Sequence, residues 1–172
     1  MRSVKVLAVL LGAVMGVVTG MAQTSVSQGS TATFTVPTLI RLTVNTATID
    51  FGSLTMDDYD LGYKEITSGQ IVTVWSNRSW TLTVAADSAT WIGPWAKPAS
   101  DLQLKVASVS KPDRVSSYAS AYFGLSTTAA NVAVGVPGGN IAFTMDFKVL
   151  LSWDNDVAGD YSLGFTYTLT AP

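Results

Sequence analysis

The sequence predicts an all-β protein, a single antiparallel β-sandwich of immunoglobulin-like or Greek-key type with eight or nine strands after an N-terminal signal peptide. Apolar and polar residues alternate with period two along most of the chain, and no comparable stretch of helical period follows the signal. Gly, Pro, Asn and Asp separate the alternating runs, as is typical of sandwiches and barrels. Charged residues make up only 13% of the chain while threonine and valine abound, which suits sheets with hydroxyls on their outer faces.

Residues 1–22 have the features of a secretory signal peptide. Two cations precede an apolar run over residues 6–18, and Gly20 and Ala22 stand at the small-residue positions of a cleavage site. The run is nearer to the length of a signal's apolar region than to the ~20 residues that cross a bilayer. We therefore expect export and a mature domain over residues 23–172. It would be secreted or held at the cell surface or in the periplasm, without being an integral membrane protein once processed.

Alternation then predicts the strands in order. They cover residues 30–36, 39–44, 48–54, 70–76, 79–86, 101–108, 121–126, 141–151 and 161–169. Residues 76–78 predict a tight hairpin, and residues 109–120 a long loop with room for one helical turn. A single sheet buries too little to offset the entropy of ordering it, so a second sheet must cover the first. The closing strand, 161–169, is the expected antiparallel neighbour of strand 141–151.

The sequence offers little reactive chemistry. It contains no histidine and no cysteine, which excludes His-based triads, thiol nucleophiles and the common zinc sites. A hydrolase would need Glu65 with Asp57, Asp58 or Asp60, but these residues are typical of a solvated acidic loop, so no catalytic residue is predicted. Without residues 1–22, eight scattered cations face twelve acids, a net charge of −4, which argues against nucleic acid as a partner.

The tryptophans are candidates for binding or for packing. Trp91 and Trp95 stand in a Gly/Pro-rich loop, where they would either stack on sugar rings and seat a partner or plug the open end of the sandwich. The plug is the preferred interpretation because indoles usually bury most of their surface. Trp75, Trp80 and Trp153 lie on or beside strands and are expected in the core.

A short acidic segment is a candidate calcium site. Asp154, Asp156 and Asp160, with Asn155, lie within seven residues and offer the hard oxygen ligands that calcium prefers. Asx side chains that cap a turn explain the same residues and are the preferred interpretation. No other cofactor is expected.

Two motifs resemble the WxL family of bacterial surface domains. The first is the tripeptide Trp80-Thr81-Leu82 in a strand. The second is the tail, which is also similar to spore-coat-U-type and other fimbrial subunits: Ala158, Gly159 and Tyr161 match an A-G-x-Y turn, and Tyr167-Thr168-Leu169 stands where a second W-x-L would close the domain. The resemblance implies an exported β-sandwich and, for the WxL family, attachment to peptidoglycan.

The A-G-x-Y turn also has a physical rationale. We expect Gly159 to adopt a positive φ and the Tyr161 hydroxyl to reach a loop backbone group, as in a tyrosine corner.

Three functions stay open. The first is a non-enzymatic surface domain that binds a cell-wall or surface component or its own copies, as an adhesion or structural protein would. The second is a fimbrial subunit that donates a strand from its mature amino terminus, residues 23–36. The complete closing strand counts against it, because donor-strand subunits lack one strand of their own. The third is a carbohydrate-binding module that uses Trp91 and Trp95.

Overall fold

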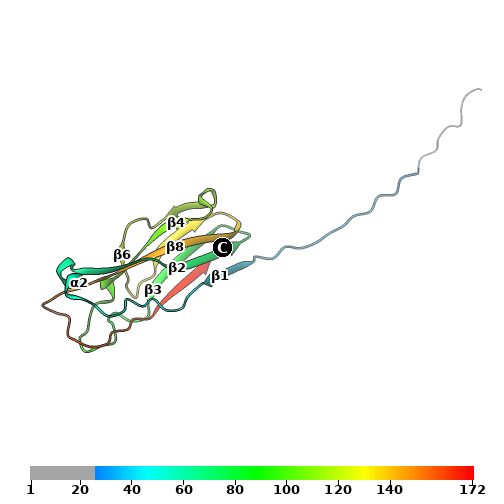
Figure 1. The fold of residues 1–172 in the computed structure, drawn as a ribbon. Coiled ribbons are helices and arrows are strands. Elements are labelled where there is room, and N and C mark those ends of the chain that lie inside the picture. Colours follow the sequence, from blue (N-terminus) through cyan, green and yellow to red (C-terminus); the bar gives the residue numbers. More distant parts are fainter. Residues whose placement is uncertain (1–25) are drawn as a thin grey trace, which may run out of the picture. The chain divides into compact units, whose positions relative to one another are not determined.

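The computed structural model describes residues 26–172 of the chain. The predicted signal peptide, residues 1–22, lies outside the described residues. Pro37–Pro172 forms one compact unit of two antiparallel sheets packed face to face, so the predicted β-sandwich is confirmed (Figure 1). Within Met1–Val36, the described residues 26–36 form neither helix nor strand, so the strand predicted over 30–36 is wrong. Between residues 26 and 172, no helix combines the length and apolar character needed to span a bilayer.

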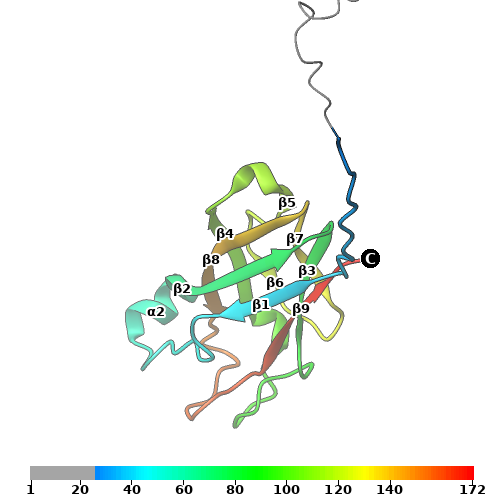
Figure 2. The ribbon, with the colours of Figure 1, turned by 90° about the vertical axis from the view of Figure 1, so that its right-hand side faces the viewer.

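The first sheet has five strands in the order β1-β2-β8-β4-β6, and the second has four in the order β5-β7-β3-β9 (Figure 2). The elements in chain order are β1 (Ile40–Val44), α2 (Met56–Leu61), β2 (Tyr63–Ser76), β3 (Trp80–Ala86), η1 (Ala99–Asp101), β4 (Leu102–Val109), η2 (Pro112–Arg114), β5 (Val115–Tyr118), β6 (Phe123–Gly124), β7 (Ala130–Gly135), β8 (Gly138–Leu150) and β9 (Phe165–Thr170).

The core lies between the inner faces of β3 and β8. Alternate residues of β3, Trp80, Leu82 and Val84, are no more than 2% exposed, which follows from the period-two pattern of that strand. The inner row of β8 contributes Phe143 and Phe147, both fully buried, and the Trp80 ring meets Phe143 edge-on at 5.9 Å between centroids. These aromatic contacts fix the two sheets against each other.

The helix α2 replaces part of the expected acidic loop. Thr55 and Asp58 form a capping box, in which Asp58 accepts from the Thr55 backbone N–H at 2.8 Å and Thr55 accepts from the Asp58 N–H at 3.3 Å. Gly62 ends the helix in the left-handed region, with φ at 76°. The hydrogen bonds from Thr55, followed by the one from Lys64, lower the pKa of Asp58. The capping signal T-x-x-D is present in the sequence and outweighs the turn-like composition.

Two predicted strand neighbours are wrong. Residues 76–78 do not form a hairpin but an arch between sheets, because β2 belongs to the first sheet and β3 to the second. β9 pairs with β3, where Leu169 lies opposite Leu82, and does not pair with β8. Alternation identifies which side chains share a face, but it does not specify which strand lies alongside.

The strand boundaries also differ from the prediction. The strand predicted over 48–54 is absent, although Ile49 and Phe51 still pack against the core. β5 and β7 are additional to the predicted strands, whereas the helical turn expected within 109–120 is present as η2. β2 begins at Tyr63, well before the predicted residue 70.

Of the tryptophans expected in the core, only Trp80 is fully buried. Trp75 is half-exposed and lies 5.7 Å from the guanidinium carbon of Arg41. Trp153 is 59% exposed and stacks on Tyr59 of α2 at 4.8 Å between ring centroids. Trp75 has the opposite parity to the buried Val72 and Val74 of β2, so its side chain falls on the outer face.

Candidate functional site

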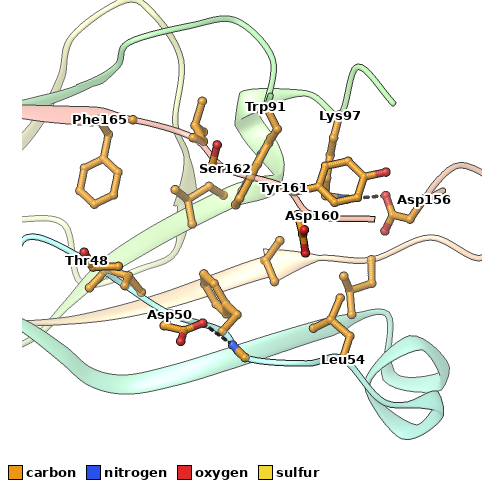
Figure 3. Close-up of a pocket in the computed structure, with 18 of the residues that line it drawn as sticks. Thr48, Asp50, Leu54, Trp91, Lys97, Asp156, Asp160, Tyr161, Ser162 and Phe165 are labelled. Carbon is orange, nitrogen blue, oxygen red and sulfur yellow. Dashed lines mark hydrogen bonds and ion pairs between the residues drawn. The ribbon is translucent and has the colours of Figure 1, made fainter. Parts of the chain in front are cut away.

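A groove of about 1120 Å³ runs along one side of the sandwich between two segments that belong to no named strand. One wall is residues 45–54, which connect β1 to α2. The other wall includes residues 156–164, which lead into β9 (Figure 3). Figure 3 shows Trp91 extending toward the space above Asp50, with the Tyr161 ring beside Lys97 and Asp156.

The first wall is held at its ends and free in its middle. The Asn45 N–H donates to the Ile71 carbonyl at 3.1 Å, and Gln70 Nε2 donates to the Thr46 carbonyl at 2.7 Å. At the other end, Lys64 Nζ donates to the Ser53 carbonyl at 3.3 Å. Because residues 47–52 add no backbone hydrogen bond to a strand of the described chain, this wall lies beside β2 without completing a ladder.

The second wall is shaped by the A-G-x-Y turn. The Tyr161 hydroxyl donates to the Val157 carbonyl at 2.7 Å and accepts from the Val157 N–H at 3.2 Å, as the tyrosine-corner prediction requires. Gly159 has a φ of 149°, and a Cβ there would lie 2.5 Å from Pro94 Cγ, so only glycine fits. Two backbone hydrogen bonds, at 2.8 and 2.9 Å, then join Ser162 to Ile92.

A buried ion pair fixes this wall to the connection between β3 and β4. Lys97 Nζ lies 2.8 Å from Asp156 Oδ1 and 3.1 Å from Asp101 Oδ2, and Lys97 is only 4% exposed. The second oxygen of Asp156 accepts from the Ser152 N–H at 3.0 Å. The Lys97 ammonium and a backbone amide therefore satisfy the Asp156 carboxylate, which leaves it no free oxygen for a metal ion.

The proposed calcium ligands are not assembled as a metal site. Asp154 and Asp160 are exposed, and Asp156 forms an ion pair with Lys97. Across residues 26–172 no group of three or more acidic side chains is arranged to hold a metal ion.

The apolar lining of the groove is incompletely covered. Its partly buried members pack against the core, and they are Ile49, Phe51, Trp91, Leu163 and Phe165. The inner row of β9 is likewise only partly buried: Phe165, Tyr167 and Leu169. Their neighbours on β3 in the same sheet are buried: Ala86, Val84 and Leu82. One side of the core therefore lacks the layer that covers it elsewhere.

Buried polar atoms in the groove also lack partners. Gln70 is 2% exposed, yet its Oε1 accepts no hydrogen bond from the described residues. The buried indole N–H of Trp91 likewise donates to none of them. A buried polar atom without a partner costs about 1–3 kcal/mol. Both atoms have essentially no solvent-accessible surface, so they lie behind the groove lining and are not exposed binding groups.

The strands at the groove have free edges. β1 pairs only with β2 and is the last strand of the first sheet, while β9 pairs only with β3 and is the last strand of the second, as far as the described residues go. The outer backbone N–H and C=O groups of an edge strand are free to bind an extended peptide.

The remaining predicted residues have structural positions. Trp80 and Leu82 are core residues, and the Trp80 Nε1 donates to the Val136 carbonyl at 2.9 Å. Trp91 lines the groove and packs against the core. Trp95 is half-buried, and its ring centroid lies 5.8 Å from Lys97 Nζ. The Tyr167 hydroxyl is buried without a partner among the described residues, and burial raises the pKa of Tyr167.

The carboxylates considered for hydrolysis are engaged separately. Glu65 accepts from the Tyr122 hydroxyl at 2.5 Å on the outer face of the first sheet, and burial followed by this bond raises the pKa of Tyr122. Asp58 is bound to Thr55 and Lys64 at the start of α2. Neither carboxylate lines the groove.

Sequence reasoning misses the groove because it comes from segments that fail to pair. The pattern of residues 48–54 is that of a strand, and only the three-dimensional pairing reveals that it makes no ladder. Lys97, which holds one wall of the groove in place, is not singled out by the sequence pattern, although its i,i+4 spacing to Asp101 is a detectable signal. The sequence matches no protein-family model and no curated protein.

Proposed function

We propose that the mature chain is an exported structural subunit that assembles with its own copies. In this proposal, residues 26–36 of one copy, hereafter the arm, enter the groove of the next copy as an added strand. The observation that carries the proposal is the groove between residues 45–54 and 156–164, beside the ends of the two edge strands β1 and β9, in which an apolar row is half-covered.

The dimensions and chemistry of the groove favour an extended peptide over a small molecule. Its volume of about 1120 Å³ exceeds the ~300–1000 Å³ that is usual for small-molecule sites. An added strand would pair its backbone with the free edge of β9.

The arm has the composition of such a strand. Ala32, Phe34 and Val36 alternate with threonines, so an extended arm presents one apolar face. Phe34 is 88% exposed and Val36 61%, and no described residue of the arm belongs to a strand. Burying each of these two side chains would contribute about 1.5–3 kcal/mol, and each net main-chain hydrogen bond about 1 kcal/mol.

The objection that a complete closing strand raises against strand donation does not apply to this fold. β9 pairs with β3 alone, and although β1 lies near it, no described strand forms a ladder on the other edge of β9, whose backbone groups are left to a donated strand. The similarity of the A-G-x-Y tail to fimbrial subunits and the predicted signal peptide are consistent with an exported subunit.

Substitution of Phe34 by aspartate tests this function. We expect the mature wild-type chain to form multimers in sedimentation velocity at micromolar concentration and Phe34→Asp to stay monomeric. A carboxylate at this position would lose its hydration against the apolar row of the groove and would meet the aspartates that also line it, such as Asp50 and Asp160. The matched control is Thr33→Asp, which places the same charge on the opposite face of the arm and should preserve multimers. A monomeric wild-type chain, or equal assembly by both variants, would refute the proposal.

A further inference from the structure

The long axis of the sandwich separates opposite charges. Figures 1 and 2 place α2 at one end of the Pro37–Pro172 unit and the carboxyl terminus, which follows β9, at the other. We define the α2 end as residues 45–62, 87–101 and 151–164. We define the turn end, which contains the arch between β2 and β3, as residues 37–41, 75–80, 110–114 and 135–140.

The α2 end is acidic. With the exception of Asp113 and Asp146, every aspartate of the chain lies there: Asp50, Asp57, Asp58, Asp60, Asp87, Asp101, Asp154, Asp156 and Asp160. Lys97 of this end forms ion pairs with Asp101 and Asp156. Lys64, which lies just beyond it, pairs with Asp58. Exposed carboxylates such as Asp57, Asp154 and Asp160 have no ion pair within the described part of the chain.

The turn end is basic. It carries Arg41, Arg78, Lys111 and Arg114, all of them exposed, and a single acid, Asp113, which lies 3.1 Å from Arg114. Lys111 and Arg114 line a shallow hollow of about 570 Å³ together with Leu39 and Trp75. The two ends thus have complementary charge, and each also exposes apolar side chains: Met56, Leu61 and Trp153 at the α2 end, and Leu39 and Ile40 at the turn end.

Covalent geometry brings these ends together if the arm occupies a neighbour's groove. Val36 of the arm is followed at once by Pro37, and Asn77 holds this start of the body by donating to the Pro37 carbonyl at 2.7 Å and accepting from the Leu39 N–H at 2.8 Å. No linker separates the arm from the turn end. An arm that leaves the groove at the α2 end therefore brings the donor's turn end against the acceptor's α2 end.

We propose, on the basis of the proposed function, that the basic turn end of one copy docks on the acidic α2 end of the next, and that this charge complementarity sets a head-to-tail order. Such a contact is heterologous and does not close on itself, so it extends into a filament. Opposite charges steer the encounter, and like charges exclude the reversed order.

Charge reversal with rescue tests this proposal in the full mature chain. Variant A carries Arg78→Glu and Arg114→Glu, which change the net charge of the turn end from +3 to −1, so both of its ends are acidic. Variant B carries Asp57→Lys, Asp60→Lys, Asp154→Lys and Asp160→Lys, which change the net charge of the α2 end, with Lys64 counted, from −7 to +1, so both of its ends are basic. We expect each variant alone to associate at least tenfold more slowly than wild type. An equimolar mixture should recover assembly, because every contact then joins a basic end to an acidic one. A chain with all six substitutions should recover as well.

Salt provides an independent readout. Raising the ionic strength from about 0.1 to about 1 M shortens the screening length from roughly 10 to 3 Å, so the association rate of wild type should fall about tenfold or more. Variant A or B assembling like wild type, or a mixture that fails to recover, would overturn the docking proposal. If Phe34→Asp abolishes assembly while variants A and B assemble normally, strand donation stands and only the charge-ordered contact is refuted.

Discussion

Replacing Trp80 with alanine is expected to lower the free energy of unfolding by about 3–5 kcal/mol. Trp80 is 2% exposed, meets Phe143 edge-on, and donates its indole N–H to the Val136 carbonyl at 2.9 Å. The substitution removes these contacts and leaves a cavity between the sheets, which partial relaxation cannot fill. Since domains of this size are stable by only about 5–15 kcal/mol, much of the fold's stability would be lost.

The matched control is Trp153→Ala. Trp153 is 59% exposed and contacts Tyr59 at the surface, so its loss should cost less than about 1 kcal/mol. Urea unfolding followed by circular dichroism gives both values. The measurements belong in the Phe34→Asp background, because assembly would otherwise add to the apparent stability. Equal costs for the two tryptophans would contradict the packing described for Trp80.

Replacing Lys97 with methionine is expected to cost about 3–5 kcal/mol. The substitution leaves the Asp156 carboxylate, whose side chain is 3% exposed, buried beside Asp101 without its cation. An uncompensated buried charge is far more costly than the intact pair is favourable. The same change should release residues 151–160 from the connection between β3 and β4, and so weaken the wall of the groove.

Lys64→Met is the control for the Lys97 substitution. Lys64 pairs with Asp58 at 3.0 Å, but its side chain is 26% exposed, so removal should cost about 1 kcal/mol or less. The double variant Lys97→Met/Asp156→Leu should regain part of the loss, since it removes both charges from the interior. A Lys97→Met variant as stable as Lys64→Met would show that the buried pair does not hold this wall.

The sequence is informative about faces and less so about neighbours. Period-two alternation correctly predicts the core rows of β3 and β8, because a buried face demands apolar residues at every second position. The same pattern contains no information about which strands pair. It therefore wrongly predicts that β9 lies beside β8 and that residues 76–78 form a hairpin, where the structure has an arch between the sheets. Strand partners are decided by long-range contacts that a local pattern does not contain.

The groove is predictable only in part. The roles of Gly159 and Tyr161 follow from local chemistry, since a positive φ and a short-range hydroxyl contact depend on near neighbours in the chain. The open side does not follow, because residues 48–54 have a strand's alternation yet make no ladder. The buried position of Lys97 is equally hidden, as its principal partner, Asp156, is 59 residues away.

Disulfide trapping between two single-cysteine variants is the most direct test of strand donation. The natural chain has no cysteine, so Phe34→Cys in one mature chain and Leu163→Cys in another provide the only two thiols in the mixture. Leu163 lines the groove, whereas Thr166, used in a control variant Thr166→Cys, is exposed on β9 outside it. Strand donation predicts that mild oxidation links the Phe34→Cys and Leu163→Cys chains into a disulfide-bonded heterodimer and gives little product with Thr166→Cys. Equal yields with the two partners, or no heterodimer with Leu163→Cys, would contradict it.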